Sequence, residues 1–409
     1  MNKMKKVPEI RFKEFAEDWE NTDASIIFKT YFDKNHPDLP VLSASQEYGM
    51  IIREDVGFKV QHNKESEAGY KRVLPGQFVI HLRSFQGGFA HSDVEGITSP
   101  AYTIIEFRDK SQQDDIFWKY VLTSKEFIKR LETVTYGIRD GRSISFEDFS
   151  ELGFNVPDIK EQCKIGKTLT VIDTLIRKLE QKLEKLRNIK QSLLNQMFVN
   201  VNRGGYAPLI RFNGYNNKWI MLTLNDISER ITRKNTNNES SLPLTVSAQY
   251  GLINQNDFFN SRIASKDVSG YYLIKNGEFA YNKSSSDGYP FGAVKRLDRY
   301  KMGVLSTLYI IFALNKDKID SDFLSIFFET DKWYEHISQR AAEGARNHGL
   351  LNISSEDFLD LKILTPKSKN EQNLIAGYVS ALDRLVEGTS SKLTKLRTMK
   401  QSLLQKMFV

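Results

Sequence analysis

The chain has 409 residues and a formal net charge of +7. Its length predicts two or more domains, and its charge mildly favours a polyanionic partner. The longest apolar run, at 308–314, is too short to cross a bilayer, and no apolar stretch follows the basic start, so neither a membrane span nor a signal peptide is predicted. The only cysteine, Cys163, excludes an internal disulfide framework and a multi-cysteine zinc site, and it suits a reducing cytoplasm.

The first half of the chain predicts a globular part that ends in a long helix. Strand-like runs at 76–83 and 101–107 lie between loops rich in Gly, Asn and Ser. Residues 114–131 predict an amphipathic helix that begins at aspartates suited to N-capping. From Ile165 to Met197 the spacing of apolar residues alternates between four and three, which is typical of a coiled-coil helix.

The second half repeats this order. Strands are predicted at 277–283 and 308–314, an amphipathic helix at 320–340, and a second coiled-coil helix at the end of the chain. The sequence itself is duplicated, because KQSLLNQMFV at 190–199 returns as KQSLLQKMFV at 400–409. Earlier segments also match, in the pairs PEIRFKEFAEDW (8–19) and PLIRFNGYNNKW (208–219), SQEYGMI (45–51) and SAQYGLI (247–253), and KLEKLRNIKQSLL (182–194) and KLTKLRTMKQSLL (392–404). The chain is therefore two copies of one unit, and such a repeat decides the architecture.

The order of elements also predicts the fold class. In each copy several strands precede the helix, without the alternation of strand and helix that a doubly wound parallel sheet requires. We therefore expect an α+β protein with two similar globular domains and two long helices.

Each long helix presents an apolar seam. The seam contains Ile172, Ile176, Leu183, Leu186 and Leu193 in the first copy, and Leu382, Val386, Leu393, Leu396 and Leu403 in the second. Both seams place a lysine at the same position, Lys190 and Lys400. Such a lysine either fixes the register of the pair or extends from the helix edge into solvent, and the sequence favours neither reading. Gly388-Thr389-Ser390-Ser391 predicts a kink or a short break in the second helix.

No catalytic apparatus is predicted in this chain. Gly166-Lys167-Thr168 lacks the glycine that a phosphate-binding loop needs five residues earlier, where Glu161 stands, and is read as helix surface. No GxGxxG follows a strand, and the six histidines lack metal-ligand spacing. The pairing of Glu161 with Lys164 is read as a surface ion pair.

Polar, glycine-containing loops recur at equivalent places in both copies and predict DNA contacts. Arg and Lys reach guanine edges, Asn and Gln reach adenine, and Ser, Thr and Lys hold phosphates. The candidates are Arg83, Ser84, Gln86, Arg139 and Arg142 in the first copy, and Tyr281, Asn282, Lys283, Ser284, Ser286, Arg346, Asn347 and His348 in the second.

The whole pattern resembles the specificity (S) subunit of type I restriction-modification systems. The resemblance rests on the duplicated tail, EQ…LxxID…KLxxLRxxKQSLLxxMFV, on the loop containing YNKS, and on the order of domain, helix, domain, helix. It implies two target recognition domains, at 1–157 and 204–366, that each read one half of a split site in double-stranded DNA. It also implies two spacer helices, at 158–203 and 367–409, that pair antiparallel with pseudo-twofold symmetry.

The resemblance further implies a non-catalytic, cytoplasmic subunit. Its helices would dock two methyltransferase subunits, through which restriction subunits join. S-adenosylmethionine, ATP and Mg would then belong to these partners, and this chain would hold no cofactor or metal. Two alternatives stay open. A coiled-coil scaffold without DNA contact would show salt-insensitive DNA retention, unlike a protein that neutralises phosphates. A stand-alone restriction or methylation enzyme would bind S-adenosylmethionine itself.

Overall fold

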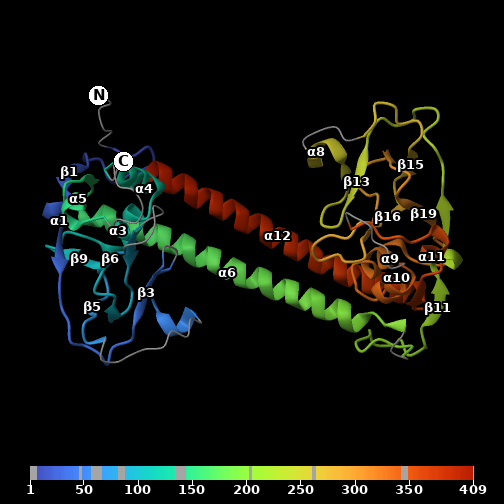
Figure 1. The fold of residues 1–409 in the computed structure, drawn as a ribbon, viewed down its shortest axis with the longest axis horizontal. Helices are drawn as coiled ribbons and strands as arrows, with labels where there is room; N and C mark the ends of the chain where they lie inside the picture. Colours follow the sequence, from blue (N-terminus) through green and yellow to red (C-terminus); the bar gives the residue numbers. More distant parts are fainter. Residues whose placement is uncertain are drawn as a thin grey trace. The chain divides into compact units, whose positions relative to one another are not determined.

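The computed structural model of the chain describes residues 7–45, 48–56, 67–81, 88–134, 144–201, 205–259, 264–341 and 349–408. The chain divides into two compact units, one formed by Met1–Gln181 with Ser390–Val409 and the other by Lys182–Thr389. Each unit contains a sheet-rich globular part and segments of both long helices, as the element labels in Figure 1 show.

The first unit is built on a four-stranded antiparallel sheet in the order β2-β9-β6-β7, joined by the two-stranded pairs β1-β10, β3-β4 and β5-β8. Its elements are β1 (Glu20–Asp23), α1 (Ala24–Ile27), β2 (Phe28–Tyr31), β3 (Leu42–Ser45), β4 (Gly49–Ile52), the 3-10 helix η1 (Arg53–Val56), β5 (Lys71–Val73), β6 (Phe78–Ile80), β7 (Phe89–His91), β8 (Gly96–Thr98), β9 (Thr103–Phe107), α3 (Asp115–Leu122), α4 (Lys125–Val134), α5 (Phe146–Ser150), β10 (Gly153–Val156) and α6 (Ile159–Met197).

The second unit repeats this topology. Its four-stranded sheet has the order β12-β19-β16-β17, and its two-stranded pairs are β11-β20, β13-β14 and β15-β18. Its elements are β11 (Ile220–Thr223), α7 (Leu224–Ile227), β12 (Ser228–Ile231), β13 (Leu244–Ser247), β14 (Gly251–Asn254), α8 (Gln255–Phe259), β15 (Tyr272–Lys275), β16 (Phe279–Asn282), β17 (Ala293–Arg296), β18 (Met302–Leu305), β19 (Ile310–Leu314), α9 (Ser321–Phe327), α10 (Tyr334–Arg340), α11 (Ser355–Leu359), β20 (Lys362–Thr365) and α12 (Lys369–Met407). The predicted duplication and the α+β fold class are confirmed.

Aromatic side chains fill the core between sheet and helices in each globular part. In the first, Phe28 meets Trp118 edge to face, with ring centroids 5.1 Å apart. In the second, Phe279 stacks on Phe312 at 5.3 Å. Such rings each bury about 150–250 Å² and so dominate the energetics of a core. This core holds the face of the sheet firmly, which leaves the connecting loops to vary.

Each predicted amphipathic helix is divided into two shorter helices, which corrects the sequence-based bounds. The expected N-caps are present, since Asp114 accepts a hydrogen bond from the backbone of Phe117 and Asp320 from that of Phe323. In the first copy α3 ends at Leu122, and Ser124 then accepts a hydrogen bond from the backbone N–H of Phe127. Serine competes for backbone hydrogen bonds in this way, and a second helix begins instead of the first continuing.

Helix α12 is continuous through Gly388, so the predicted break is wrong. All 39 residues of Lys369–Met407 are helical. Thr389 is buried at the seam with an exposed fraction of 6 %, and Thr394 donates a hydrogen bond to the carbonyl of Ser390 one turn earlier. The packing of seam residues before and after Gly388 therefore outweighs the cost of one glycine inside a helix, which is about 1 kcal/mol.

The two long helices pack antiparallel along the predicted seams. In the first unit Lys400, near the end of α12, lies 2.5 Å from Asp173 near the start of α6. In the second unit Lys190, near the end of α6, lies 2.5 Å from Asp383 in α12. The seam residues are buried or half-buried, namely Ile172, Ile176, Leu183, Leu186, Leu193, Leu382, Val386, Leu393, Leu396 and Leu403. The cross-helix ion pairs favour the reading in which the seam lysines fix the register.

Candidate functional site

The loop of the β16–β17 hairpin is the best described of the predicted contact loops. It begins at the end of β16, where strand alternation turns Tyr281 inward and leaves Asn282 partly exposed. Tyr281 is fully buried, stacks on Phe358 at 4.3 Å, and donates its hydroxyl to the carbonyl of Phe291. Burial raises the pKa of this phenol. Tyr281 thus holds the base of the loop from inside, which corrects its assignment as a DNA-contacting residue.

The other candidates of this loop lie at or near the surface. Ser286 is exposed, and Asn282, Lys283 and Ser284 are half-buried. The carbonyl of Asn282's side chain accepts a hydrogen bond from the backbone N–H of Ser284, and the ammonium of Lys283 donates to the carbonyl of Ile353 at 3.4 Å. These contacts shape the loop but leave hydroxyl and amide groups that can still bind a ligand.

A second chain segment joins this loop. Ser284 forms an antiparallel bridge with Leu350, and the backbone N–H of Ser285 donates to the carbonyl of Gly349 at 2.7 Å. Leu350 and Gly349 directly follow the sequence in which Arg346, Asn347 and His348 stand. The fold thus places the loop after β16 next to the residues that directly follow the other predicted contact segment of this copy.

The first globular part shows the same convergence. The backbone N–H of His81 donates to the carbonyl of Gly88 at 2.8 Å, which closes the base of the β6–β7 hairpin. A Cβ at Gly88 would lie 3.6 Å from the side chain of Ile144, which follows the other predicted loop. The candidates themselves, Arg83, Ser84, Gln86, Arg139, Arg142, Arg346, Asn347 and His348, lie outside the described residues.

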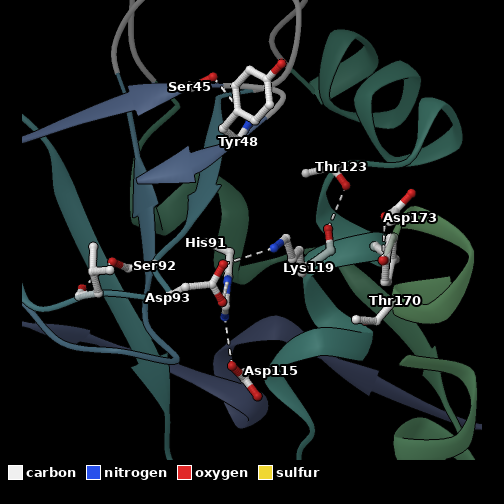
Figure 2. Close-up of polar contacts among 12 residues, drawn as sticks. Ser45, Tyr48, His91, Ser92, Asp93, Asp115, Lys119, Thr123, Thr170 and Asp173 are labelled. Carbon is white, nitrogen blue, oxygen red and sulfur yellow. Dashed lines mark hydrogen bonds and ion pairs between the residues drawn. The ribbon is translucent and has the colours of Figure 1, made fainter. Parts of the chain in front are cut away.

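A buried histidine fastens strand β7 to helix α3 (Figure 2). The side chain of His91 is 1 % exposed, and its Nε2 lies 2.8 Å from a carboxylate oxygen of Asp115. Its Nδ1 lies 3.3 Å from Asp93, which also meets the ammonium of Lys119 at 3.3 Å. Burial lowers the pKa of His91, but the two carboxylates outweigh burial and raise it. The hydrogen bond from His91 in turn lowers the pKa of Asp115.

An arginine occupies the equivalent place in the second globular part. Arg296 lies opposite Phe279 in the β16–β17 ladder, just as His91 lies opposite Phe78 in the β6–β7 ladder. Its guanidinium reaches Asp298 and Asp322 at 2.7 Å each, and the hydroxyl of Ser321 at 2.8 Å. A cation thus links the returning hairpin strand to the first turn of the following helix in both copies. Sequence reasoning missed both residues, because their partners lie on separate elements.

A buried glutamate joins each globular part to its own long helix. Glu161 is 0 % exposed and receives two hydrogen bonds from Arg11, at 2.8 and 2.7 Å, and one from the indole of Trp19. Its earlier reading as a surface partner of Lys164 is wrong, since Lys164 pairs with Glu14. The second unit repeats the group with Glu371, Arg211 and Trp219. A recurring signal was present in the sequence, because Arg, Trp and Glu stand at matching places in both copies.

The glutamine that follows each of these glutamates makes a second connection. Gln162 accepts a hydrogen bond from the backbone N–H of Asp114 and donates to the carbonyl of Pro157. Gln372 does the same with Asp320 and Pro366. In each copy the Glu-Gln pair therefore anchors two segments to the start of the long helix. The glutamate holds the segment that contains the arginine and the tryptophan, and the glutamine holds the N-cap of α3 or α9.

Apolar side chains are also exposed on the outer sides of the long helices. Leu175 and Leu385 stand at matching positions and are 45 % and 51 % exposed. Ile189 and Met399 match in the same way. Met399 lines a shallow groove of about 460 Å³, together with Ile10, Thr394, Lys395, Thr398, Ser402 and Leu403. Recurrence in both copies marks these positions as candidate contacts for a partner that binds twice.

Within the described parts of the chain, no group of three or more His, Cys, Asp or Glu residues is placed to hold a metal ion. No helix in these parts is long and apolar enough to span a membrane.

Residues 5–188 match the family model of the type I restriction modification DNA specificity domain. The fold is similar to that of the S subunit of a type I restriction-modification system from M. genitalium, at 15 % sequence identity and a TM-score of 0.58, over 98 % of this chain and 99 % of that one. The HsdS subunit from Thermoanaerobacter tengcongensis matches at 12 % identity and a TM-score of 0.48, over 95 % of this chain and 96 % of that one.

Proposed function

We propose that this chain belongs to the type I restriction-modification DNA specificity family, that it recognises a bipartite DNA site, and that it catalyses no reaction itself. Each globular part is a recognition domain that reads one half-site. The observation that carries the proposal is that the two globular parts share their topology and their joints to the helices but differ in their candidate contact loops. Both domains share one topology and one joint to the helices, whereas their candidate contact residues differ in kind. Different donor and acceptor sets select different base edges, so the site is asymmetric.

Two copies of a methyltransferase subunit are the proposed partners of the helices. The matching exposed positions support this assignment, because Leu175 and Met399 belong to the first unit while Leu385 and Ile189 belong to the second. Two equivalent surfaces suit two identical partners. Restriction subunits join through these partners, and S-adenosylmethionine, ATP and Mg act there rather than on this chain. We place the assembly in the cytoplasm.

DNA recognition is tested by selection of randomised duplex DNA with the full chain. Two short specified segments separated by an unspecified gap are expected, and affinity should fall steeply with salt. Lys283→Ala should weaken binding about equally for all sequences and lower the salt slope by about one unit if the ammonium neutralises a phosphate. Lys275→Ala, an exposed lysine of β15, is the matched control. Retention without sequence preference or salt dependence would instead favour the scaffold alternative.

Partner docking is tested by counting methyltransferase subunits per chain in native mass spectrometry. Ile189→Asp and Met399→Asp should each remove one of two bound subunits, and the double variant should remove both. Leu308→Asp changes a more exposed apolar residue outside the helices and should leave two bound. Full occupancy in the double variant would place docking elsewhere.

A further inference from the structure

The two recognition domains fasten equivalent strands with cations of different chemistry. His91 ends β7, the strand that returns from the segment of Arg83, Ser84 and Gln86. Arg296 ends β17, the strand that returns from the loop of Lys283 to Ser286. Each cation reaches an aspartate two residues later in the chain, Asp93 or Asp298, and the first turn of α3 or α9. An arginine stays charged at any pH that the fold withstands, whereas a histidine does not.

We propose that His91 and Arg296 are equivalent cationic pins that position the recognition hairpins, and that only the first pin weakens as the pH rises. For its effect on DNA, this inference rests on the proposed function. For its effect on the hairpin, it rests on the geometry alone.

The charged groups around His91 fix the sign of the effect. Helix α3 contributes Asp115 and Lys119, and the segment after β7 contributes Asp93. Strand β6 contributes the uncharged ring of Phe78 at 5.1 Å, and at β4 a Cβ on Gly49 would lie 2.3 Å from the backbone carbonyl oxygen of His91. Imidazolium holds Asp115 by a hydrogen bond at Nε2 and Asp93 by charge alone, since Nδ1 lies 3.3 Å from Asp93 without making a hydrogen bond. Deprotonation of His91 therefore ends the attraction to Asp93 and leaves the negative charge of Asp93 beside a neutral buried ring.

The pH window follows from the raised pKa of His91. The stabilising effect is complete below about pH 6.5, the ordinary pKa of histidine. It is lost as the pH rises through the higher pKa of the folded state, and the ratio of folded to unfolded domain falls by up to about tenfold per pH unit between the two values.

A shift of β7 matters for recognition because contact groups must be held within about 0.5 Å of their productive geometry. The segment of Arg83, Ser84 and Gln86 is only a few residues from His91 in the chain. When the pin weakens, selectivity for the half-site of the first domain should fall by several-fold, while selectivity for the other half-site stays constant.

The pin itself is tested by hydrogen–deuterium exchange of the full chain between about pH 6 and about pH 8. Peptides covering β7 and β17 are compared among the wild type and His91→Arg, His91→Gln and Arg296→His variants. His91→Arg should protect β7 at every pH, and His91→Gln should reproduce the high-pH behaviour at every pH. Arg296→His should give β17 the pH dependence that β7 has in the wild type. Comparison at equal pH removes the intrinsic pH dependence of exchange.

The DNA effect is tested by selecting randomised duplex DNA with the same proteins at the two pH values. At the higher pH the wild type should select the bases of one half-site less strictly, and His91→Arg should restore that sequence selectivity. His36→Gln, which changes a carboxylate-paired histidine at the surface of the same domain, should behave as the wild type.

The outcomes separate the two claims. If β7 exchanges alike in the wild type, His91→Arg and His91→Gln at all pH values, the pin is refuted. If exchange at β7 changes with pH but the sequence selectivity for both half-sites stays constant, the pin is structural only and its role in recognition is refuted. If no sequence is selected at any pH, the proposed function fails, and the exchange data still decide the pin.

Discussion

The two globular parts, which we propose to be recognition domains, are most alike at their joints to the long helices and least alike along their hairpins. Arg11, Trp19 and Glu161 recur as Arg211, Trp219 and Glu371 with nearly the same distances. The hairpin pins differ, with a histidine in one domain and an arginine in the other. A buried ion pair cannot change one member at a time without leaving a charge unpaired. The pins can differ because their carboxylate partners have side chains that are 37 to 60 % exposed, so a change of cation leaves no carboxylate charge fully buried. The joints thus form a frame that both copies share, while the hairpins vary on it, which agrees with the proposal that they read different half-sites.

The seam lysines lie between these extremes. Lys400 pairs with Asp173, whose other oxygen receives the hydroxyl of Tyr120 at 2.6 Å. Lys190 pairs with Asp383 and also with Glu329 at 2.7 Å. Burial raises the pKa of Asp383 despite its lysine partner. The cross-helix ion pair is thus common to both units. The additional partner, Tyr120 in one unit and Glu329 in the other, comes from the globular part and differs between the two copies.

The largest expected effect tests the common joint. Glu161→Ala and Glu371→Ala should each lower the free energy of unfolding by about 3 kcal/mol or more, because each leaves a largely buried guanidinium without its carboxylate. The two losses should be similar, since the contacts are similar. Chemical denaturation of the full chain measures them.

Glu180→Ala is the control for this prediction. Glu180 forms an exposed pair with Arg397, and such pairs contribute about 1 kcal/mol or less. If the joint variants lose no more than this control, solvent or another group replaces the carboxylate and the joint does not hold the frame.

Sequence periodicity predicted the long helices and many of the strands well, because the spacing of apolar residues within each segment determines its secondary structure. It failed where contacts join distant segments. Glu161 has a lysine three residues away, and nothing local shows that Arg11, 150 residues earlier, is its partner. The break expected at Gly388 follows from local propensity, which tertiary packing overrides. Tyr281 stands in a polar loop motif, but strand alternation in β16 turns it into the core. The pins combine residues from several elements and have no local signature.

A glycine pair gives a smaller and unequal effect. Gly49 and Gly251 stand at the same place in the repeated motif, with φ of +74° and +79°. A Cβ at Gly49 would lie 2.3 Å from the carbonyl oxygen of His91, whereas a Cβ at Gly251 meets nothing within 4 Å. Gly251→Ala should therefore cost about 1 kcal/mol for the left-handed backbone alone. Gly49→Ala should cost at least about 1 kcal/mol more, because β4 and β7 must separate. Thermal denaturation measures both, and equal costs would show that the two hairpins relax alike.

The smallest expected effect has the opposite sign and tests the continuity of the helices. Gly388 is an exposed position inside α12, and a Cβ there meets nothing within 4 Å. Its match in α6 is Lys178, also exposed. Gly388→Ala should raise the free energy of unfolding by about 0.5–1 kcal/mol, because alanine loses less backbone entropy on helix formation. Lys178→Gly should lower it by a similar amount. Denaturant titration followed by circular dichroism in the helix band measures both changes. Substitutions at exposed positions inside helices show propensity differences of roughly this size. If Gly388→Ala destabilises the chain instead, helix propensity does not decide the stability at this position of α12 and the prediction is refuted.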